Sequence, residues 1–396
     1  MSTTDPEAPD SGLDLERVYE TFESSTDFTV GLEEEFAILD PETLELEHRF
    51  VELNEAAQSD PELAAAVRGE LIDTEIEIRS GRGVTFADAA ERQVERRRRL
   101  FALAESKGAA LASAGTHPWA SYLDQRIIDT EHYQLLREEL RWVVQRNNTW
   151  SLHVHVGVRG ADRAVAVCDR LRERLPVLLA ISANSPFLDG HDTGLHSVRT
   201  EIFTRTFPRC GVHEPFGGWA EYADFVELLA GTGTIVEATQ LWWSVRPHHA
   251  FGTIEVRICD AQTRGDESFG LAALIAACVG QCAIDHDEGR GGELPGQRQI
   301  EENLWRAIRH GLDGEMIDFS KRATVPTRRV ADDLIAWSEP ARVQMGLDEP
   351  SLPEANGAQR ARSGLADGAS IPDIYRAAVE ETRASFAPAQ VPAVDD

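Results

Sequence analysis

Apolar and polar residues alternate with a period of two in several separate stretches of this 396-residue chain. Such alternation is typical of β-strands that bury one face and expose the other. The strands predicted in this way are residues 28–39, 70–80, 150–158, 241–246 and 253–259. The polar face of most of these strands carries ionisable groups, so one face of the predicted sheet is expected to line a wet site.

Helical periodicity fills most of the chain between these strands. The predicted helices are residues 13–23, 52–69, 85–107, 133–144, 162–183 and 219–229, followed by a mostly helical region from 266 to 387. Strands that alternate with helices usually form parallel units, but charged polar faces favour a curved, mainly antiparallel sheet with helices on its convex side. The predicted fold class is therefore α+β.

Three segments are expected to lie outside this regular framework. Residues 1–27 are predicted to be an N-terminal extension, partly disordered, and residues 388–396 a flexible tail, which leaves 28–387 as a single domain with a helical C-terminal part. Residues 354–368 are predicted to be flexible. Residues 184–218 read as a long polar loop and are a candidate lid, because long unstructured loops in compact domains are usually functional.

The candidate chemistry lies in pairs of ionisable residues two positions apart on the predicted strands. These pairs are Glu33/Glu35, Glu75/Glu77, His153/His155 and Glu255/Arg257, with Glu70 and Asp73 at the edge of the second strand. One such pair fits a solvated sheet face, whereas four together indicate a site. Clustered carboxylates repel one another and need cations between them. An oxygen-rich set with imidazole suits Mg²⁺ or Mn²⁺ better than Zn²⁺.

Arginines near such a metal face would suit ATP phosphates and a substrate carboxylate, since the guanidinium binds both in a bidentate manner. The candidates are Arg199, Arg205, Arg246 and Arg257, and the last two lie on predicted site strands. Each arginine taken alone could equally form a surface ion pair. The chain has no Walker-A motif, no G-x-G-x-x-G and no G-x-S-x-G. If ATP binds, it binds through metal and arginine.

The amino-acid composition limits the binding partners, the source and the cellular compartment that we expect for the protein. Acidic residues number 68 and basic residues 39, which gives a net charge of −29 and argues against binding to nucleic acid or to anionic membranes. Lys107 and Lys321 are the only lysines, and an acidic chain so poor in lysine suggests a halophilic archaeal source, where salt shortens the Debye length to about 3 Å.

Scattered cysteines, no secretory signal and no run of 18 apolar residues predict a cytoplasmic protein without a membrane span. A homo-oligomer is compatible with the sequence.

Several motifs, in their order along the chain, resemble the type 2 glutamate–cysteine ligase family, also called carboxylate–amine ligases. They are GLEEEF (31–36), GTHPW (115–119), HVHVG (153–157), SANSPFLDGHDTG (182–194) and RPHHAFGTIEVRICD (246–260). The resemblance covers about residues 28–290 and, more loosely, the helical remainder. It implies a fold like the catalytic domain of glutamine synthetase, with Mg²⁺ ions in the concave face of the sheet.

The resemblance also assigns roles to individual residues. It implies metal binding by Glu33, Glu35, Glu70, Glu77, His153 and Glu255, with Asp73 as a less regular match. It implies contacts with nucleotide or substrate by His155, Arg199, Arg246 and Arg257, of which His155, Arg246 and Arg257 would be catalytic. Glu34 and Glu75 are expected to point away from the site. His117 could contact substrate or serve as a structural turn residue.

The implied reaction is ATP-dependent ligation of the glutamate γ-carboxylate to the amine of cysteine through a γ-glutamyl phosphate. The products would be γ-glutamylcysteine, ADP and phosphate, and the partners would be glutamate, cysteine and ATP. One alternative keeps this chemistry with another amino acid or amine as acceptor. Others are an ATP-independent divalent-metal hydrolase and a catalytically silent binding protein.

Overall fold

The computed structural model describes residues 13–386, and the terminal segments predicted to be disordered or flexible, 1–12 and 388–396, lie outside the described residues. Within them, one seven-stranded sheet has the order β2-β3-β1-β5-β9-β8, and β4 pairs with the end of β1. Its strands are β1 (Val30–Leu39), β2 (Val67–Arg68), β3 (Glu75–Arg79), β4 (Ala110–Ala112), β5 (Ser151–Gly157), β8 (Val245–His248) and β9 (Thr253–Asp260). Every pairing in this sheet is antiparallel, so the predicted sheet type is confirmed.

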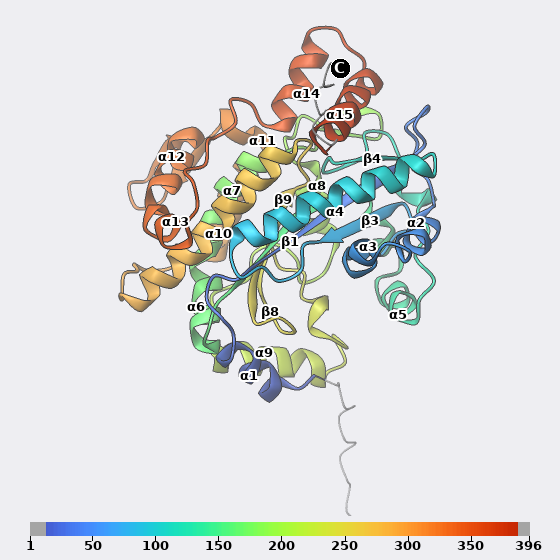
Figure 1. The fold of residues 1–396 in the computed structure, drawn as a ribbon. Helices are drawn as coiled ribbons and strands as arrows, with labels where there is room; N and C mark the ends of the chain where they lie inside the picture. Colours follow the sequence, from blue (N-terminus) through green and yellow to red (C-terminus); the bar gives the residue numbers. More distant parts are fainter. Residues whose placement is uncertain (1–12, 387–396) are drawn as a thin grey trace, which may run out of the picture.

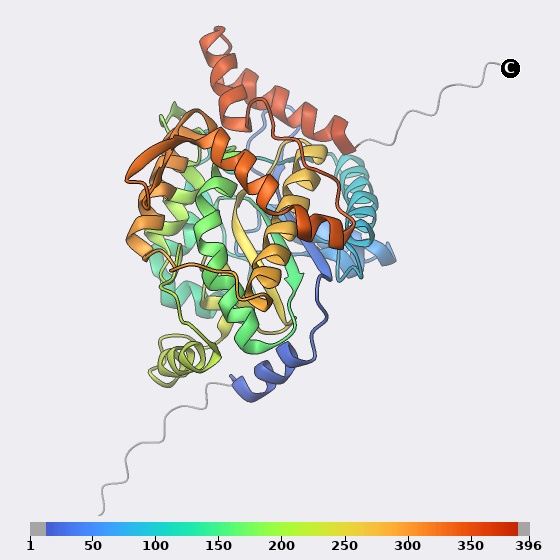
Figure 2. The same cartoon turned by 90° about the vertical axis from the view of Figure 1, so that its left-hand side faces the viewer.

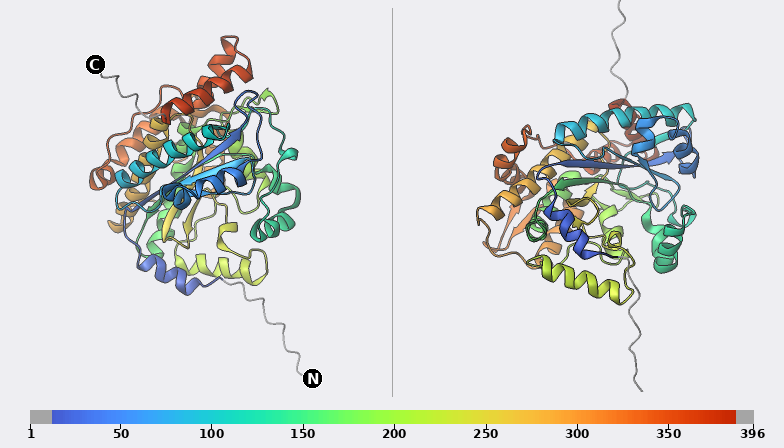
Figure 3. Two further views of the ribbon diagram at one scale, coloured as in Figure 1. Left: turned by 45° about the vertical axis from the view of Figure 1, so that its right-hand side comes forward. Right: turned by 60° about the horizontal axis from the view of Figure 1, so that its bottom comes forward.

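Helices cover one face of the sheet. α4 and α10 run across this face in Figure 1, and the C-terminal helices pack along one side of the molecule in Figure 2. α5 and α9 lie on the opposite side of the sheet from α4 (Figure 3). The helices are α1 (Leu15–Glu23), α2 (Phe50–Ala57), α3 (Pro61–Ala66), α4 (Phe86–Ser106), α5 (Glu131–Leu140), α6 (Ala161–Leu171), α7 (Leu175–Ser182), α8 (Val198–Thr206), α9 (Trp219–Gly231), α10 (Gly265–Asp287), α11 (Gln297–His310), α12 (Thr327–Trp337), α13 (Glu339–Met345), α14 (Gly357–Ala366) and α15 (Ile371–Phe386). Two small hairpins complete the fold: β6 (Phe187–Leu188) with β7 (His191–Asp192), and β10 (Glu315–Asp318) with β11 (Ala323–Pro326).

The period-two pattern explains which face is covered. Leu32, Val154 and Val256 belong to the main core cluster, which they share with apolar residues of α6, α7 and α10. Their neighbours in sequence, such as Glu33 and His153, face the other side because successive strand residues point to opposite faces. One face is therefore a packed core and the other can carry charge.

Several local predictions were wrong, among them the single helix 52–69, which is α2, α3 and the short strand β2. The expected helix 162–183 is two helices, α6 and α7, which a 3-10 turn separates just before Pro176. Proline lacks the amide hydrogen that a continuous helix needs, so a new helix begins near it. Residues 354–368 contain α14, and the predicted loop 184–218 contains α8.

α10 passes the length and composition criteria for a membrane-crossing helix. However, 72% of its apolar window is buried inside the protein. Its apolar residues pack in the main core cluster against β5 and α6, as expected of the central helix of a large hydrophobic core.

Candidate active site

The polar face of the sheet lines a cavity of about 480 Å³. The site residues predicted from the sequence that line it are Glu33, Glu35, Glu70, His153, Arg199, Arg246, Glu255 and Arg257. Two more adjoin it. Glu77 is buried beside Glu33, and His155 lines a neighbouring cavity of about 430 Å³ that shares Glu33 and Arg79 with the first. Strands far apart in sequence, together with α8 and the segment before β3, thus bring these ten residues to one face of the sheet.

The strand register determines which of these residues meet. In the β1–β3 ladder Glu33 lies opposite Arg79 and Glu35 lies opposite Glu77. In the β1–β5 ladder Glu33 lies opposite His153. Directly opposed residues bring their side chains within contact distance when they share a face. Glu33 therefore sits between a cationic and an imidazole neighbour at the centre of the sheet.

The pairing of β9 with β5 and with β8 determines which residues meet on the other side of the site. Glu255 lies opposite His155 on β5 and opposite Arg246 on β8. The β5–β9 ladder shifts register between Leu152 and Val154, where β9 contributes one extra residue near Arg257. Bulges of this kind re-aim side chains and are common next to active sites.

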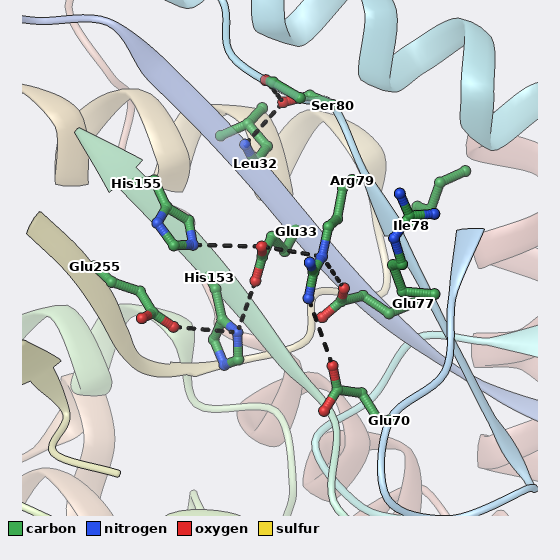
Figure 4. A network of polar contacts seen from close by, with 12 residues as sticks. Leu32, Glu33, Glu70, Glu77, Ile78, Arg79, Ser80, His153, His155 and Glu255 are labelled. Atoms are coloured by element: carbon green, nitrogen blue, oxygen red, sulfur yellow. Dashed lines mark hydrogen bonds and ion pairs between the residues drawn. The ribbon is translucent and has the colours of Figure 1, made fainter. Parts of the chain in front are cut away.

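In the described part of the chain, two groups of side chains have the geometry to hold a metal ion. Glu33, Glu77 and His153 form one, and Glu33, His155 and Glu255 form the other; within each group the ligand atoms lie within 4.8 Å of one another. Glu33 belongs to both, with one carboxylate oxygen 3.5 Å from His153 Nδ1 and the other 3.4 Å from His155 Nε2 (Figure 4). All members of both groups are buried.

Glu35 is held from the neighbouring strand. The backbone N–H of Ser151 donates to its carboxylate at 2.5 Å, and the Ser151 hydroxyl donates to the same oxygen at 2.6 Å. The hydroxyl oxygen also lies 2.7 Å from His153 Nε2. Ser151 thus fixes both a candidate carboxylate ligand and the ring of a candidate imidazole ligand.

The pKa values show that carboxyl groups are crowded on this face. Burial raises the pKa of Glu35 to about 7, and burial with the charge of Glu35 raises that of Glu70 to about 7. Burial and the charge of Glu33 raise the pKa of Glu77 well above its ordinary value. A bound divalent cation favours the ionised form of its carboxylate ligands, so these protonated groups would release protons as an ion binds.

Other groups on this face keep their charge. Burial alone would raise the pKa of Glu255, but Arg246 and Arg257 hold it well below its usual range. The pKa of His155 is raised, because its attraction to Glu33 outweighs the effect of burial. Burial and the nearby Arg257 lower the pKa of His153 to about 3, so its ring is neutral, the form that binds metal.

The four predicted arginines differ in their contacts. Arg246 donates through Nε to Glu255 at 2.6 Å and through Nη1 to the carbonyls of Thr239 and Leu241 at 2.8 and 2.7 Å. Arg257 also contacts Glu255 through Nη1, while its buried Nε has no hydrogen-bond partner among residues 13–386. Arg246 therefore positions Glu255, whereas Arg257 retains a donor at the cavity.

Arg199 reaches the cavity from α8. Its Nη1 and Nη2 donate to the carbonyls of Ile258 and Arg257, both at 3.2 Å, and its buried Nε has no partner. Arg205 lies six residues further along α8, where it is exposed and forms an ion pair with Glu201 at 3.5 Å. The structure thus excludes Arg205 from the site and places Arg199 in it.

Among the neighbouring acids, one expectation was wrong. Glu34 points to the helix-covered face, where it lies 3.3 Å from Arg97 and accepts hydrogen bonds from Gln93 and Ser268. Glu75, in contrast, shares the site face with Glu77 because the two are two residues apart on β3. Both of its oxygens are buried without a partner, and burial raises its pKa well above the ordinary value.

Two further candidates lie outside the acidic face. Asp73 contacts His48 and does not line the cavity, whereas Glu70 does. His117 accepts hydrogen bonds from the N–H groups of Trp119 and Ala120 through Nδ1 and donates through Nε2 to the Leu44 carbonyl. His117 is thus a structural turn residue.

The segment 184–218 is tied to the sheet and does not resemble a free lid. The Asp260 carboxylate accepts hydrogen bonds from the Asn184 N–H and from the hydroxyls of Ser185 and Ser197, at 2.6–2.9 Å. These bonds hold the start of the segment and the N-terminus of α8 against β9. The anchoring in turn positions Arg199.

Sequence reasoning missed some residues at the cavity. Arg79 belongs to the same alternating pattern as Glu77, but its central position follows only from the pairing of β3 with β1. The cavity walls also include the aromatic side chains of Tyr133, Phe203, Phe207 and Trp242. In the structure these residues come from helices and loops; Trp242 lies within the predicted strand 241–246, and the other three lie outside every predicted strand.

Comparisons of the sequence with family models and with known proteins point to the same family. The model of the family described as glutamate-cysteine ligase family 2 matches residues 29–381. A Sorangium cellulosum protein named "Putative glutamate--cysteine ligase 2" is 42% identical over 310 residues, which are 78% of this chain and 82% of that protein. A Rubrobacter xylanophilus protein, similarly named with the number 2-2, is 37% identical over 370 residues, 93% of this chain and 95% of its own length. These relatives lend no support to a halophilic archaeal source.

Solved structures share the fold at low sequence identity. A glutamate–cysteine ligase from Francisella tularensis, solved in complex with AMP, has a TM-score of 0.65 at 11% identity and covers 93% of this chain and 91% of that one. A bifunctional glutathione synthetase from Pasteurella multocida has a TM-score of 0.63 at 10% identity, and the match covers 94% of this chain and 54% of that one. At this identity the likeness establishes the fold alone.

Proposed function

The chain belongs to glutamate-cysteine ligase family 2, and from this premise we propose that it is an ATP-dependent ligase that joins the γ-carboxylate of glutamate to the amine of cysteine. The observation that carries the proposal is the position of Glu33, which two metal-capable groups share at the floor of a cavity. Arginine donors and aromatic walls surround the same cavity. We further propose that residues 28–386 form one catalytic domain and that the enzyme is cytoplasmic.

The donor set fits Mg²⁺ or Mn²⁺. The candidate ligands are mostly carboxylate oxygens with one imidazole in each group, and all are buried at ligand-to-ligand spacings below 4.8 Å. The residues that would hold the ions are Glu33, Glu35, Glu70, Glu77, His153, His155 and Glu255. Bound Mg²⁺ would hold phosphate oxygens of ATP and offset charge on the transferring phosphoryl group.

The reaction requires activation of the carboxylate, because oxide is a poor leaving group. A γ-carboxylate oxygen of glutamate attacks the γ-phosphorus of ATP, ADP leaves, and a γ-glutamyl phosphate forms. The amine nitrogen then attacks the acyl carbon, and phosphate leaves with the carboxylate oxygen. The amine gives up a proton in this second step, so the products are the amide, ADP and phosphate.

The chain's own groups fit the parts of this scheme. Arg257 and Arg199 each keep a buried Nε without a partner, and such donors suit phosphate or carboxylate oxygens. Arg246 donates a hydrogen bond to Glu255, and two backbone carbonyls accept hydrogen bonds from the same guanidinium and hold it in place. His155 and Phe251 line the second cavity, and His248, which lines the first, stacks on Phe251 with the ring centroids 4.4 Å apart. The aromatic ring of Phe251 offers a flat surface suited to an adenine ring.

The acyl phosphate must be shielded from water, since water would hydrolyse it. Phe203, Phe207 and Trp242 line one wall of the cavity and contact one another as rings 4.6–5.9 Å apart. An apolar wall beside the reacting carboxylate limits the number of water molecules that can approach. The walls do not include a thiol-specific feature, so a different amine remains the alternative acceptor.

The experiment that tests the proposal measures ADP release with ATP, Mg²⁺ and glutamate, across a panel of amino acids and small amines. We expect cysteine to give the highest kcat/KM, with one amide formed per ADP. A higher value for another amine would retain the chemistry and replace the acceptor. Hydrolysis of an amide or ester without ATP, or no ADP release with any amine, would contradict the proposed ligase.

A further inference from the structure

Arg79 occupies the centre of the acidic face. Its Nε lies 3.1 Å from Glu33 and also contacts Glu77, and its Nη2 lies 3.9 Å from Glu70 (Figure 4). Its Cα stands directly opposite that of Glu33 in the β1–β3 ladder, so the strand register places it there. One guanidinium group therefore links three carboxylates that come from three different segments.

The same carboxylates belong to a metal-capable group. Glu33 and Glu77, together with His153, form one of the two groups with metal-ligand spacing. A guanidinium that bridges Glu33 and Glu77 and a divalent ion that binds between them need the same carboxylate oxygens. The two cations cannot hold these oxygens at once without a change in the position of Arg79.

We propose that Arg79 is a built-in counter-cation that occupies the Glu33–Glu77 position and that a divalent ion must displace from it. Arg79 thereby sets the metal affinity of this position and links its loading to a movement of one side chain. The inference deepens the proposed function, because it concerns the ion site of the ligase, but it does not depend on the ligation reaction.

The contacts of Arg79 suit a group that moves. Within residues 13–386, the polar contacts of its guanidinium are with Glu33, Glu70 and Glu77. Arg246 differs, because its guanidinium also satisfies two backbone carbonyls. Withdrawal of Arg246 would leave buried carbonyls unpaired, which is unfavourable. Withdrawal of Arg79 leaves only carboxylates, which the incoming ion would bind.

There is also space for the displaced side chain. Arg79 is 35% exposed and lines both the 480 Å³ cavity and the neighbouring 430 Å³ cavity. Hydroxyl groups of Ser24, Ser25 and Thr26 line the second cavity. A guanidinium turned towards this space stays hydrated and stands where it can meet an anionic substrate group. Metal loading would in this way move a positive charge from the carboxylates to the substrate cavity.

Mn²⁺ binding to the full chain, without nucleotide or amino acid, tests the proposal. Mn²⁺ titrations followed by electron paramagnetic resonance would compare the wild type with Arg79→Gln. We expect one class of Mn²⁺ site to bind about tenfold more tightly in the variant, the equivalent of about 1.4 kcal/mol. Arg82→Gln is the matched control, since Arg82 lines the second cavity but contacts none of the three carboxylates, and we expect its Mn²⁺ affinity to equal that of the wild type.

The outcomes separate this proposal from a general charge effect and from the ligase reaction. Unchanged or weaker Mn²⁺ binding in Arg79→Gln overturns it, as does an equal gain in Arg82→Gln. If Arg79→Gln folds only when Mn²⁺ is present, the ion has replaced the guanidinium and the proposal is supported. If Arg79→Gln does not fold at all, Arg79→Lys is tested in its place. A Mn²⁺ affinity of Arg79→Lys above that of the wild type supports the proposal, and an affinity equal to or below that of the wild type contradicts the proposal. Mn²⁺ binding without ADP formation would contradict the ligase and leave the role of Arg79 intact.

Discussion

The carboxylate of Glu33 lies 3.5 Å from Nδ1 of His153, and the two residues face each other directly across the β1–β5 ladder. This pairing places an ionised oxygen beside a neutral imidazole at the centre of the sheet. Because Glu33 also approaches His155, it is common to both metal-capable groups. A change at Glu33 should therefore affect both ion positions at once.

Replacement of Glu33 by glutamine tests this dependence. We expect Glu33→Gln to fold, since the amide has nearly the same size, and to lose Mn²⁺ affinity by about 100-fold, in the range seen when groups that support a metal site are altered. Metal-dependent ADP formation should fall with it. Mn²⁺ titration and far-ultraviolet circular dichroism measure the two properties. Retained affinity in a folded variant would remove Glu33 from the ion site.

The adjacent Glu34 gives the matched comparison, because it points to the opposite face. Glu34→Gln breaks the buried ion pair with Arg97 and leaves an uncompensated charge in the core. Removal of one partner of such a pair costs about 3–5 kcal/mol. We expect a lower free energy of unfolding in urea with Mn²⁺ affinity unchanged in the folded protein. Lost metal affinity without lost stability would contradict the assignment of the two faces.

Arg257 and Arg205 offer a second matched pair. Arg257 lines the cavity with a free Nε, whereas Arg205 is exposed on α8 and pairs with Glu201. We expect Arg257→Lys to lower kcat by about 100-fold, the effect of losing one donor to a developing negative charge. Arg205→Lys should retain wild-type kcat. Similar values for the two variants would exclude a role for Arg257 in turnover.

His117 predicts a pH dependence of stability away from the metal site. Burial lowers its pKa from 6.5 to about 4, and Nδ1 accepts two backbone hydrogen bonds that protonation would break. The unfolded chain therefore takes up a proton below pH 6.5 that the folded chain refuses until about pH 4. The stability due to the neutral ring is complete above pH 6.5 and falls by roughly 3 kcal/mol as the pH drops to 4.

Urea unfolding at pH 7.5, 6 and 4.5 measures this effect by comparison with His117→Gln. The wild type should be more stable than the variant at pH 7.5, and the difference should shrink towards pH 4.5. A difference that does not change with pH would show that His117 does not titrate as its burial implies.

The sequence predicted the site face because strand side chains alternate strictly. Glu33, His153 and Glu255 were assigned to one face from their spacing alone, and antiparallel pairing followed from the charge on that face. The opposed partners were not predictable, because register depends on contacts between distant strands. Arg79 shows this limit: its face was clear from its spacing to Glu77, but its position between three carboxylates required the β1–β3 register.

Helix and loop contributions to the site were harder to predict. The segment 184–218 is rich in glycine, proline and polar residues, which favoured a loop, yet it contains α8. Its helix is stabilised by tertiary hydrogen bonds such as that of Ser197 with Asp260, which local propensity does not reveal. Glu75 is a different case: the resemblance placed it away from the site, although the alternation puts it on the same face as Glu77.

The most direct test of the proposed ligase follows the γ-carboxylate oxygen of glutamate. Glutamate labelled with ¹⁸O at this carboxylate would be incubated with ATP, Mg²⁺ and cysteine, and the released phosphate analysed by mass spectrometry. The proposed reaction predicts one ¹⁸O atom in each phosphate released by the wild type and no labelled phosphate from Glu33→Gln. Unlabelled phosphate from the wild type would show that water, and not the glutamate carboxylate, accepts the phosphoryl group, and would contradict the ligase mechanism.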